Sequence, residues 1–287
     1  MTTLSMSGRT VLVTGATNGI GLATAEALAR LGAHVGVVGR NPERTEAVVG
    51  RLRAAAPEGS LGGHVADLSD LAQVRRLADE VTAAYPRLDV LVNNAGGVWA
   101  TRRVTVDGFE HTFAVNHLAP FLLTHLLLPR LRESAPARVV TVSSAAHALG
   151  RIDFEDLGGA KGYSGQRAYN QSKLANVLFT VELARRTAGQ GVTANAMHPG
   201  VVRSGFAAED PSLMMRLGMP LVRPLMRSPE RAATTAVYLA SSPDVADVTG
   251  AYFADSKRRE PAARARDLDA ARRLWKVSAE MVGIPPG

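Results

Sequence analysis

Residues 10–21 have the sequence Thr-Val-Leu-Val-Thr-Gly-Ala-Thr-Asn-Gly-Ile-Gly, and residues 22–30 continue with Leu-Ala-Thr-Ala-Glu-Ala-Leu-Ala-Arg. The first five residues are β-branched or apolar and favour a buried parallel strand, whereas residues 22–30 favour a helix. Between the two lies a glycine-rich turn, where the free N–H groups of the helix can bind phosphate. We expect Gly15 to permit the tight turn, Gly19 to admit a pyrophosphate and Gly21 to let the helix pack closely on the strand.

The rest of the chain alternates apolar strands with amphipathic helices. This alternation predicts an α/β fold, a single doubly wound Rossmann domain with a parallel sheet of order 3-2-1-4-5-6-7 and helices on both faces. The 287 residues suit one such domain and leave no room for a second of normal size. We expect a dinucleotide-binding domain at 1–255, with a substrate loop at 201–228, and a basic C-terminal tail with a short helix at 256–287.

The composition narrows the class of protein. The chain has no cysteine, which excludes disulfides, thiolate metal sites and thiol catalysis and favours a cytoplasmic location. The net charge is +7, but the basic residues are scattered and aromatic residues make up only 5%, so we expect no nucleic-acid partner. No histidine pair has metal-ligand spacing backed by carboxylates, so we expect no metal.

Hydropathy predicts no membrane span. Residues 1–8 lack the apolar core of a signal peptide. The longest apolar run, 118–128, is too short to cross a bilayer, and we interpret it as a buried core or interface helix.

Tyr169 and Lys173 stand four residues apart in a predicted helix, so their side chains share one helix face. A free tyrosine has a pKa near ~10, and an adjacent ammonium favours the phenolate. Lowering the pKa to ~7 requires about 4 kcal/mol of differential interaction. The pair is therefore a candidate for proton transfer, whereas Tyr163 lacks a lysine at this spacing.

Further motifs follow the predicted strands in order. They are Asp67-Leu68 after the third strand, Asn93-Asn94-Ala95-Gly96 after the fourth, Asn116, Ser143-Ser144 at the end of the fifth, and His198-Pro199-Gly200 at the end of the sixth. Together with Gly-xxx-Gly-x-Gly, Tyr169 and Lys173, this ordered set resembles the short-chain dehydrogenase/reductase family, from about Thr10 to Phe253.

The resemblance implies four catalytic residues. Tyr169 would exchange a proton with the substrate oxygen, which Ser144 would also bind. Lys173 would lower the Tyr169 pKa and bind the nicotinamide ribose, and Asn116 would hold a relay water. The cofactor-binding residues that it implies are Gly15, Thr17, Asn18, Gly19, Ile20, Gly21, Arg40, Asp67, Leu68, Asn94, Ala95, Gly96, Tyr169, Lys173, Pro199, Gly200, Val202 and Ser204.

Arg40 favours NADP(H) over NAD(H). An NAD site needs an acidic residue near the end of the second strand to bind the ribose 2′-hydroxyl. The nearest acid, Glu43, follows Pro42 and should open the next helix. Arg40 instead offers a planar set of donors to a 2′-phosphate.

The long gap from Ser144 to Tyr169 resembles the retinol-dehydrogenase-like and WW-domain-oxidoreductase-like branch, as do residues 170–179 and the charged tail ending near Trp275. Members of that branch act on lipophilic aldehydes, retinoids and steroids. We expect this chain to lack their membrane anchor and any WW module, so retinoid activity does not carry over directly.

Methionines of the substrate loop would form either a mobile lid or a buried helix: Met214, Met215, Met219 and Met226.

We therefore expect an NADP(H)-dependent carbonyl reductase or alcohol dehydrogenase with a lipophilic substrate. The alternatives are an epimerase or dehydratase of extended type, disfavoured by the glycine spacing, and a non-catalytic NADP(H)-binding redox sensor. The resemblance leaves a homodimer open, through the helices that would hold 118–128 and 169–184. It also leaves open whether the tail covers the cleft, joins an interface or is disordered.

Overall fold

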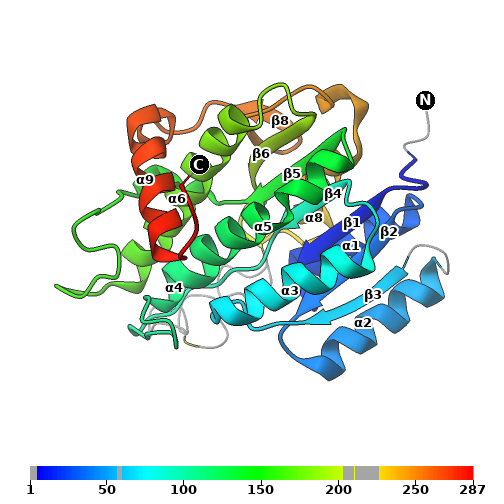
Figure 1. Cartoon of the computed structure of the whole chain (residues 1–287), viewed down its shortest axis with the longest axis horizontal. Helices are drawn as coiled ribbons and strands as arrows, with labels where there is room; N and C mark the ends of the chain where they lie inside the picture. Colours follow the sequence, from blue (N-terminus) through cyan, green and yellow to red (C-terminus); the bar gives the residue numbers. More distant parts are fainter. Residues whose placement is uncertain (1–4, 57–59, 203–209, 211–225, 287) are drawn as a thin grey trace.

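A computed structural model describes residues 5–56, 60–202, 210 and 226–286, and an eight-stranded sheet lies at its centre (Figure 1). The strand order is β3-β2-β1-β4-β5-β6-β7-β8, and the first seven strands are parallel. The predicted order 3-2-1-4-5-6-7 is therefore confirmed, while β8, antiparallel to β7, was not predicted. The strands are β1 Thr10–Thr14, β2 His34–Gly39, β3 Ser60–Val65, β4 Val90–Asn93, β5 Ala137–Val142, β6 Val192–His198, β7 Tyr252–Ala254 and β8 Lys257–Arg259.

Helices cover both faces of this sheet. One apolar cluster joins Val11 and Val13 of β1 to the helices α1, α2 and α8, and the other joins Leu12 to α3, α5 and α6. Because both faces of each central strand are covered, the strands are apolar almost throughout. The helices are α1 Gly19–Arg30, α2 Pro42–Ala55, α3 Leu71–Ala84, α4 His111–Phe113, α5 Ala119–Glu133, α6 Gly165–Arg186, α8 Pro229–Ser241 and α9 Leu268–Met281.

The turn between β1 and α1 has the steric features that its glycines predicted. Gly15 has a φ of +63°, and a Cβ there would lie 2.8 Å from the Ala95 Cα. A Cβ on Gly21 would collide with the carbonyl oxygen of Gly15. The strand order reverses between β1 and β4, so this turn lies at the topological switch point where doubly wound sheets bind ligands.

The apolar run 118–128 belongs to the core. It spans the end of a π-helical turn, η2 (Ala114–Leu118), and most of α5, and Phe121, Leu122 and Leu127 are almost fully buried. Within the described residues, the stretch His111–Glu133 is long and apolar enough to cross a membrane by length and composition, yet 78% of its apolar window is buried inside the protein. Its apolar character is thus explained by packing.

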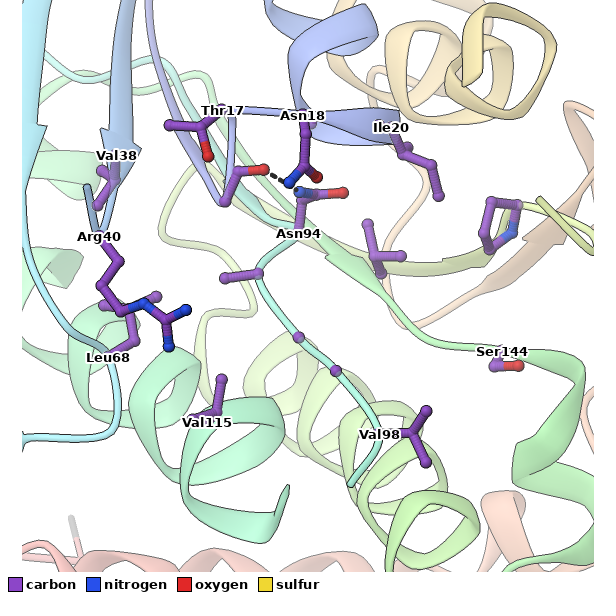
Figure 2. A pocket seen from close by; sticks show the side chains of 18 of the residues that line it. Thr17, Asn18, Ile20, Val38, Arg40, Leu68, Asn94, Val98, Val115 and Ser144 are labelled. Carbon is purple, nitrogen blue, oxygen red and sulfur yellow. Dashed lines mark hydrogen bonds between the residues drawn. The ribbon is translucent and has the colours of Figure 1, made fainter. Parts of the chain in front are cut away.

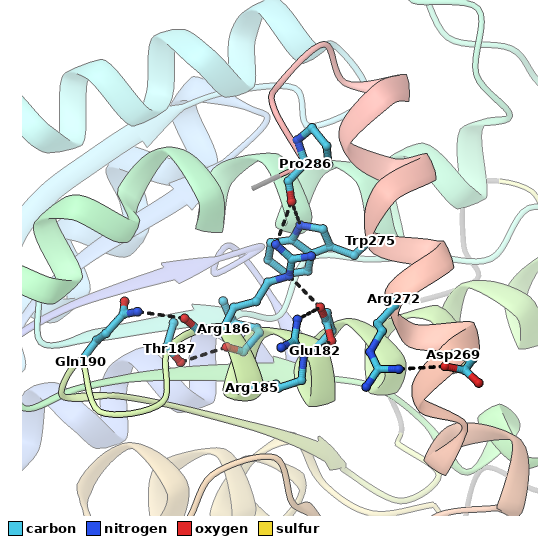
Figure 3. A network of polar contacts seen from close by, with 10 residues as sticks. Glu182, Arg185, Arg186, Thr187, Gln190, Asp269, Arg272, Trp275 and Pro286 are labelled. Carbon is cyan, nitrogen blue, oxygen red and sulfur yellow. Dashed lines mark hydrogen bonds and ion pairs between the residues drawn. The ribbon is translucent and has the colours of Figure 1, made fainter.

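The C-terminal residues 257–286 pack onto the sheet domain. The ring of Trp275 on α9 lies 4.9 Å from Phe121 of α5 and 5.9 Å from Phe179 of α6, between ring centroids. Its Nε1 donates to the Pro286 carbonyl at 2.8 Å, as does Arg186 of α6 (Figure 3). Helix α9 therefore covers part of the two helices for which the resemblance left a homodimer contact open.

Trp275 should contribute strongly to stability. Trp275→Ala removes a buried ring from a cluster with two phenylalanines, which typically costs about 3–5 kcal/mol. The measurement is urea unfolding of the full chain, with the exposed neighbour Lys276→Ala as control. Equal unfolding midpoints for the two variants would contradict the packing of α9 described above.

Candidate active site

A cleft of about 300 Å³ opens at the carboxyl edge of the sheet, where the predicted site residues converge (Figure 2). Its walls include every predicted catalytic or cofactor residue except Asn116 and Ser204. Asn116 lies behind the wall, fully buried. Ser204 lies outside the described residues, as do Met214, Met215 and Met219 and most of the 201–228 loop.

One end of the cleft is formed by the N-terminus of α1. The helix begins at Gly19 and is preceded by Asn18, whose side chain caps none of its N–H groups. The first turn contains no acidic residue. The N–H groups and the positive end of the helix dipole are therefore available to an anion, as a pyrophosphate site requires.

The adjoining wall is shaped by Asn94. Its Nδ2 donates to the carbonyls of Thr14 and Gly15 at 2.8 and 3.1 Å, and its backbone N–H donates to Thr14 Oγ1 at 3.0 Å. These bonds join the ends of β1 and β4 and hold the glycine turn against the loop that contains Ala95 and Gly96.

Arg40 follows the end of β2, and its side chain extends toward Leu68 along the cleft (Figure 2). Glu43 lies in the first turn of α2, after Pro42, as predicted. The only carboxylate that lines the cleft in the described part of the chain is Asp67, which accepts hydrogen bonds from Ser69 N and Oγ at 2.9 and 2.8 Å. The guanidinium thus adds positive charge where an NAD site would place a carboxylate.

The other end of the cleft contains Ser144, Tyr169 and Lys173. The Ser144 side chain lies close enough to Tyr169 to favour its phenolate form. The Lys173 ammonium is buried, lies 5.6 Å from the Tyr169 ring centroid and donates to the Val142 carbonyl at 3.1 Å. The neighbouring Ser143 is directed elsewhere, with its Oγ donating to the Lys173 carbonyl at 2.7 Å. Ser144 is therefore the serine that can share a substrate oxygen with Tyr169.

Burial controls protonation at this end. It raises the pKa of Tyr169 to about 12, and the nearby Ser144 side chain opposes this only in part. Burial also lowers the pKa of Lys173 to about 8. The sequence-based expectation that Lys173 brings the Tyr169 pKa down is thus not met in the protein alone. The reason is that desolvation penalises both the phenolate and the ammonium that would stabilise it.

Asn116 connects two walls of the cleft from behind. Its Nδ2 donates to the Gly97 carbonyl and to Ser172 Oγ, both at 2.9 Å, and its Oδ1 accepts from Gly97 N at 2.8 Å. Ser172 lies on α6 between Tyr169 and Lys173, and its Oγ also donates to the Tyr169 carbonyl at 2.8 Å. Asn116 therefore holds the loop after β4 against α6, and its role with a relay water stays a prediction.

Two cleft residues were missed by sequence reasoning. Trp99 and His111 both line the cleft, with ring centroids 4.4 Å apart in an edge-to-face arrangement. Trp99 lies three residues after the Asn93–Gly96 motif, and a large aromatic residue in a loop after a strand was an available signal. The sequence contained no such signal for His111, because only the folding of the preceding loop brings it to the cleft.

Tyr163, which the sequence disfavoured as the catalytic tyrosine, donates to the Trp99 carbonyl at 3.0 Å and does not line the cleft.

Comparison with known proteins agrees with this geometry. Residues 9–212 match the family model described as short chain dehydrogenase. The chain is 46% identical to mouse retinol dehydrogenase 14, over 97% of this chain and 87% of the relative, and 43% identical to human retinol dehydrogenase 13, over 98% and 86%.

Solved structures are also similar to this chain in fold and in sequence. A crystal structure of an uncharacterized Mycobacterium paratuberculosis protein has a TM-score of 0.81 and 36% identity, covering 100% of this chain and 97% of that one. The NADP complex of Pseudomonas aeruginosa RhlG has a TM-score of 0.70 and 31% identity, covering 88% and 96%. The chain belongs to the short-chain dehydrogenase/reductase family, in its retinol-dehydrogenase-like branch.

Proposed function

We propose that the protein is an NADP(H)-dependent oxidoreductase that interconverts a carbonyl and an alcohol on a lipophilic substrate. One observation carries this proposal. Ser144, Tyr169 and Lys173 lie in the same cleft as the N-terminus of α1, so that a proton donor and a dinucleotide site share one space.

The cleft suits a nicotinamide dinucleotide. The N–H groups at the start of α1 would bind the pyrophosphate, Arg40 a 2′-phosphate, and Lys173 the nicotinamide ribose. Gly96 lets the backbone pass close to these groups, since a Cβ there would lie only 2.9 Å from Asn116 Oδ1 and 3.4 Å from Lys173 Nζ. When bound, the cofactor supplies or accepts the hydride, and the protein contributes orientation and proton transfer.

Tyr169 is suited to donate the proton during carbonyl reduction. With a pKa near 12 the phenol keeps its proton at neutral pH. A carbonyl oxygen bound beside it would also accept a hydrogen bond from Ser144, which strengthens as negative charge develops. The charge on Lys173, although weakened by burial, favours loss of the phenolic proton.

Arg40 and the relatives support NADP(H). Its guanidinium can bind a 2′-phosphate through two parallel N–H donors, whereas an NAD site would need an acidic residue there. RhlG, which is similar in structure, was solved as an NADP complex.

The walls of the cleft support a lipophilic substrate. Beside the polar catalytic groups they present apolar side chains: Val98, Trp99, Val115, Val142 and Val202. Relatives 42–46% identical are named retinol dehydrogenases, which act on an apolar alcohol. The absence of cysteine supports a cytoplasmic location as part of this proposal.

Tyr169→Phe should lower kcat by about 10²–10⁴-fold, because it removes the only phenol that lines the cleft among the described residues. The assay is reduction of a panel of lipophilic aldehydes and ketones with NADPH, followed at the nicotinamide absorbance. Tyr163→Phe is the matched control and should keep wild-type kcat. Wild-type kcat in Tyr169→Phe would exclude this mechanism. Tight NADPH binding without turnover of any compound by the wild type would instead favour the redox sensor.

Arg40→Ala should lower kcat/KM for NADPH by about 10- to 100-fold, since a hydrogen bond to a charged group is worth about 1.5–3 kcal/mol. The value for NADH should change little, because NADH has no 2′-phosphate. Arg44→Ala, on the exposed first turn of α2, is the control. A wild-type enzyme that prefers NADH would show that the proposed cofactor is wrong.

A further inference from the structure

The turn after Ser144 is tied together by a histidine. Ser144 caps a 3₁₀ turn, η3 (Ala145–Leu149), with its Oγ accepting from Ala146 N at 3.2 Å. The ring of His147 folds back on this turn, and its Nδ1 lies 2.7 Å from the Ser144 carbonyl oxygen. The side chain of His147 is buried, and its ring packs on Tyr252 of β7 with centroids 4.7 Å apart.

The second nitrogen of the same ring binds the C-terminal segment, residues 262–282. The backbone N–H of Ala262 donates to His147 Nε2 at 3.1 Å. A second bond lies nearby, from Arg264 Nη1 to the Gly150 carbonyl at 3.2 Å. The turn that begins at Ser144 is thus bonded at two points to residues more than 100 positions away.

These contacts define the state of the ring. A backbone N–H can only donate, so Nε2 must present its lone pair to Ala262. The proton of the neutral ring is then on Nδ1, where it is donated to the Ser144 carbonyl oxygen. One imidazole therefore connects Ala262 to the backbone of Ser144, and neither bond can be made by a ring in the other tautomer.

The C-terminal segment also contacts the region of Asn116. His117, the next residue, is fully buried, and its Nε2 lies 2.8 Å from Ser278 Oγ on α9. The same segment thus bonds to histidines that lie one residue after Asn116 and three residues after Ser144.

We propose that the C-terminal segment is a positioning element of the active site, which holds the Ser144 hydroxyl toward Tyr169 through His147. This inference rests on the proposed function of Ser144. His147 does not line the cleft, so it acts through Ser144 and not on the substrate. The sequence left open whether this segment covers the cleft, joins an interface or is disordered. Under this proposal it has a role in catalysis.

Ala262→Pro breaks the link. The φ of Ala262 is −54°, which proline adopts, so the substitution removes the N–H donor; the proline ring carbon that replaces the amide hydrogen also displaces the His147 ring from this contact. We expect kcat to fall by about 10- to 100-fold, as misplacement of a catalytic group does, with the Kd for NADPH unchanged within about twofold. Ala262→Ser keeps the N–H and is the matched control with wild-type kcat.

Two variants of His147 separate the bonds. The amide of His147→Asn can replace Nδ1 toward Ser144 but not Nε2, whereas the amide of His147→Gln can replace Nε2 toward Ala262 but not Nδ1. We expect both to have reduced kcat with unchanged Kd for NADPH. Wild-type kcat in His147→Asn or in Ala262→Pro would show that the C-terminal bond has no role in positioning and would overturn the proposal.

Hydrogen exchange of the full chain distinguishes failure of this proposal from failure of the proposed function. In Ala262→Pro, the amides of His147 and Gly150, which donate to the Ser144 and His147 carbonyls, should exchange faster than in Ala262→Ser. Unchanged exchange overturns the link even if the wild type has no turnover. Faster exchange with an inactive wild type would support the link and refute only the enzyme function.

Discussion

The chemistry of the site depends on the burial of the Tyr169 phenol and the Lys173 ammonium at one end of the dinucleotide cleft. Burial raises the pKa of Tyr169 to about 12 and lowers that of Lys173 to about 8, so at neutral pH the phenol keeps its proton and the ammonium is still mostly charged. A neutral phenol can donate its proton, and the ammonium beside it favours the phenolate that this transfer leaves. Under the proposed function, this phenol would donate the proton in carbonyl reduction.

The sheet order and the location of the site were predictable from sequence. The glycines, the apolar strands and the polar residues after each strand act through local sterics and through the geometry of parallel sheets, which brings all strand ends to one edge. For this reason Gly15, Asn94 and Ser144 line one cleft although they are far apart in sequence. The place of Arg40 in the cleft was predictable for the same reason, because it directly follows the end of β2.

The remaining features arise from tertiary contacts that leave little local signal. His111 reaches the cleft because of how the preceding loop folds. Strand β8 pairs with β7 because the chain reverses direction between them. The sequence identified the C-terminal segment only as basic and left its role open, whereas in the structure Trp275 and Ala279 on one face of α9 are buried. The direction of the Tyr169 pKa shift was missed because helical spacing shows which side chains are close but not how much water remains around them.

The pH dependence of both reaction directions tests this account most directly. Oxidation releases one proton, so the ratio of kcat/KM for oxidation to that for reduction must rise about tenfold per pH unit. With a Tyr169 pKa near 12, kcat/KM for alcohol oxidation at saturating cofactor should carry this slope between about pH 5 and 7, below the Lys173 pKa of about 8, while reduction stays constant. A constant oxidation rate and a reduction rate that falls with pH would show that Tyr169 is already ionised near neutrality, and would contradict control by burial.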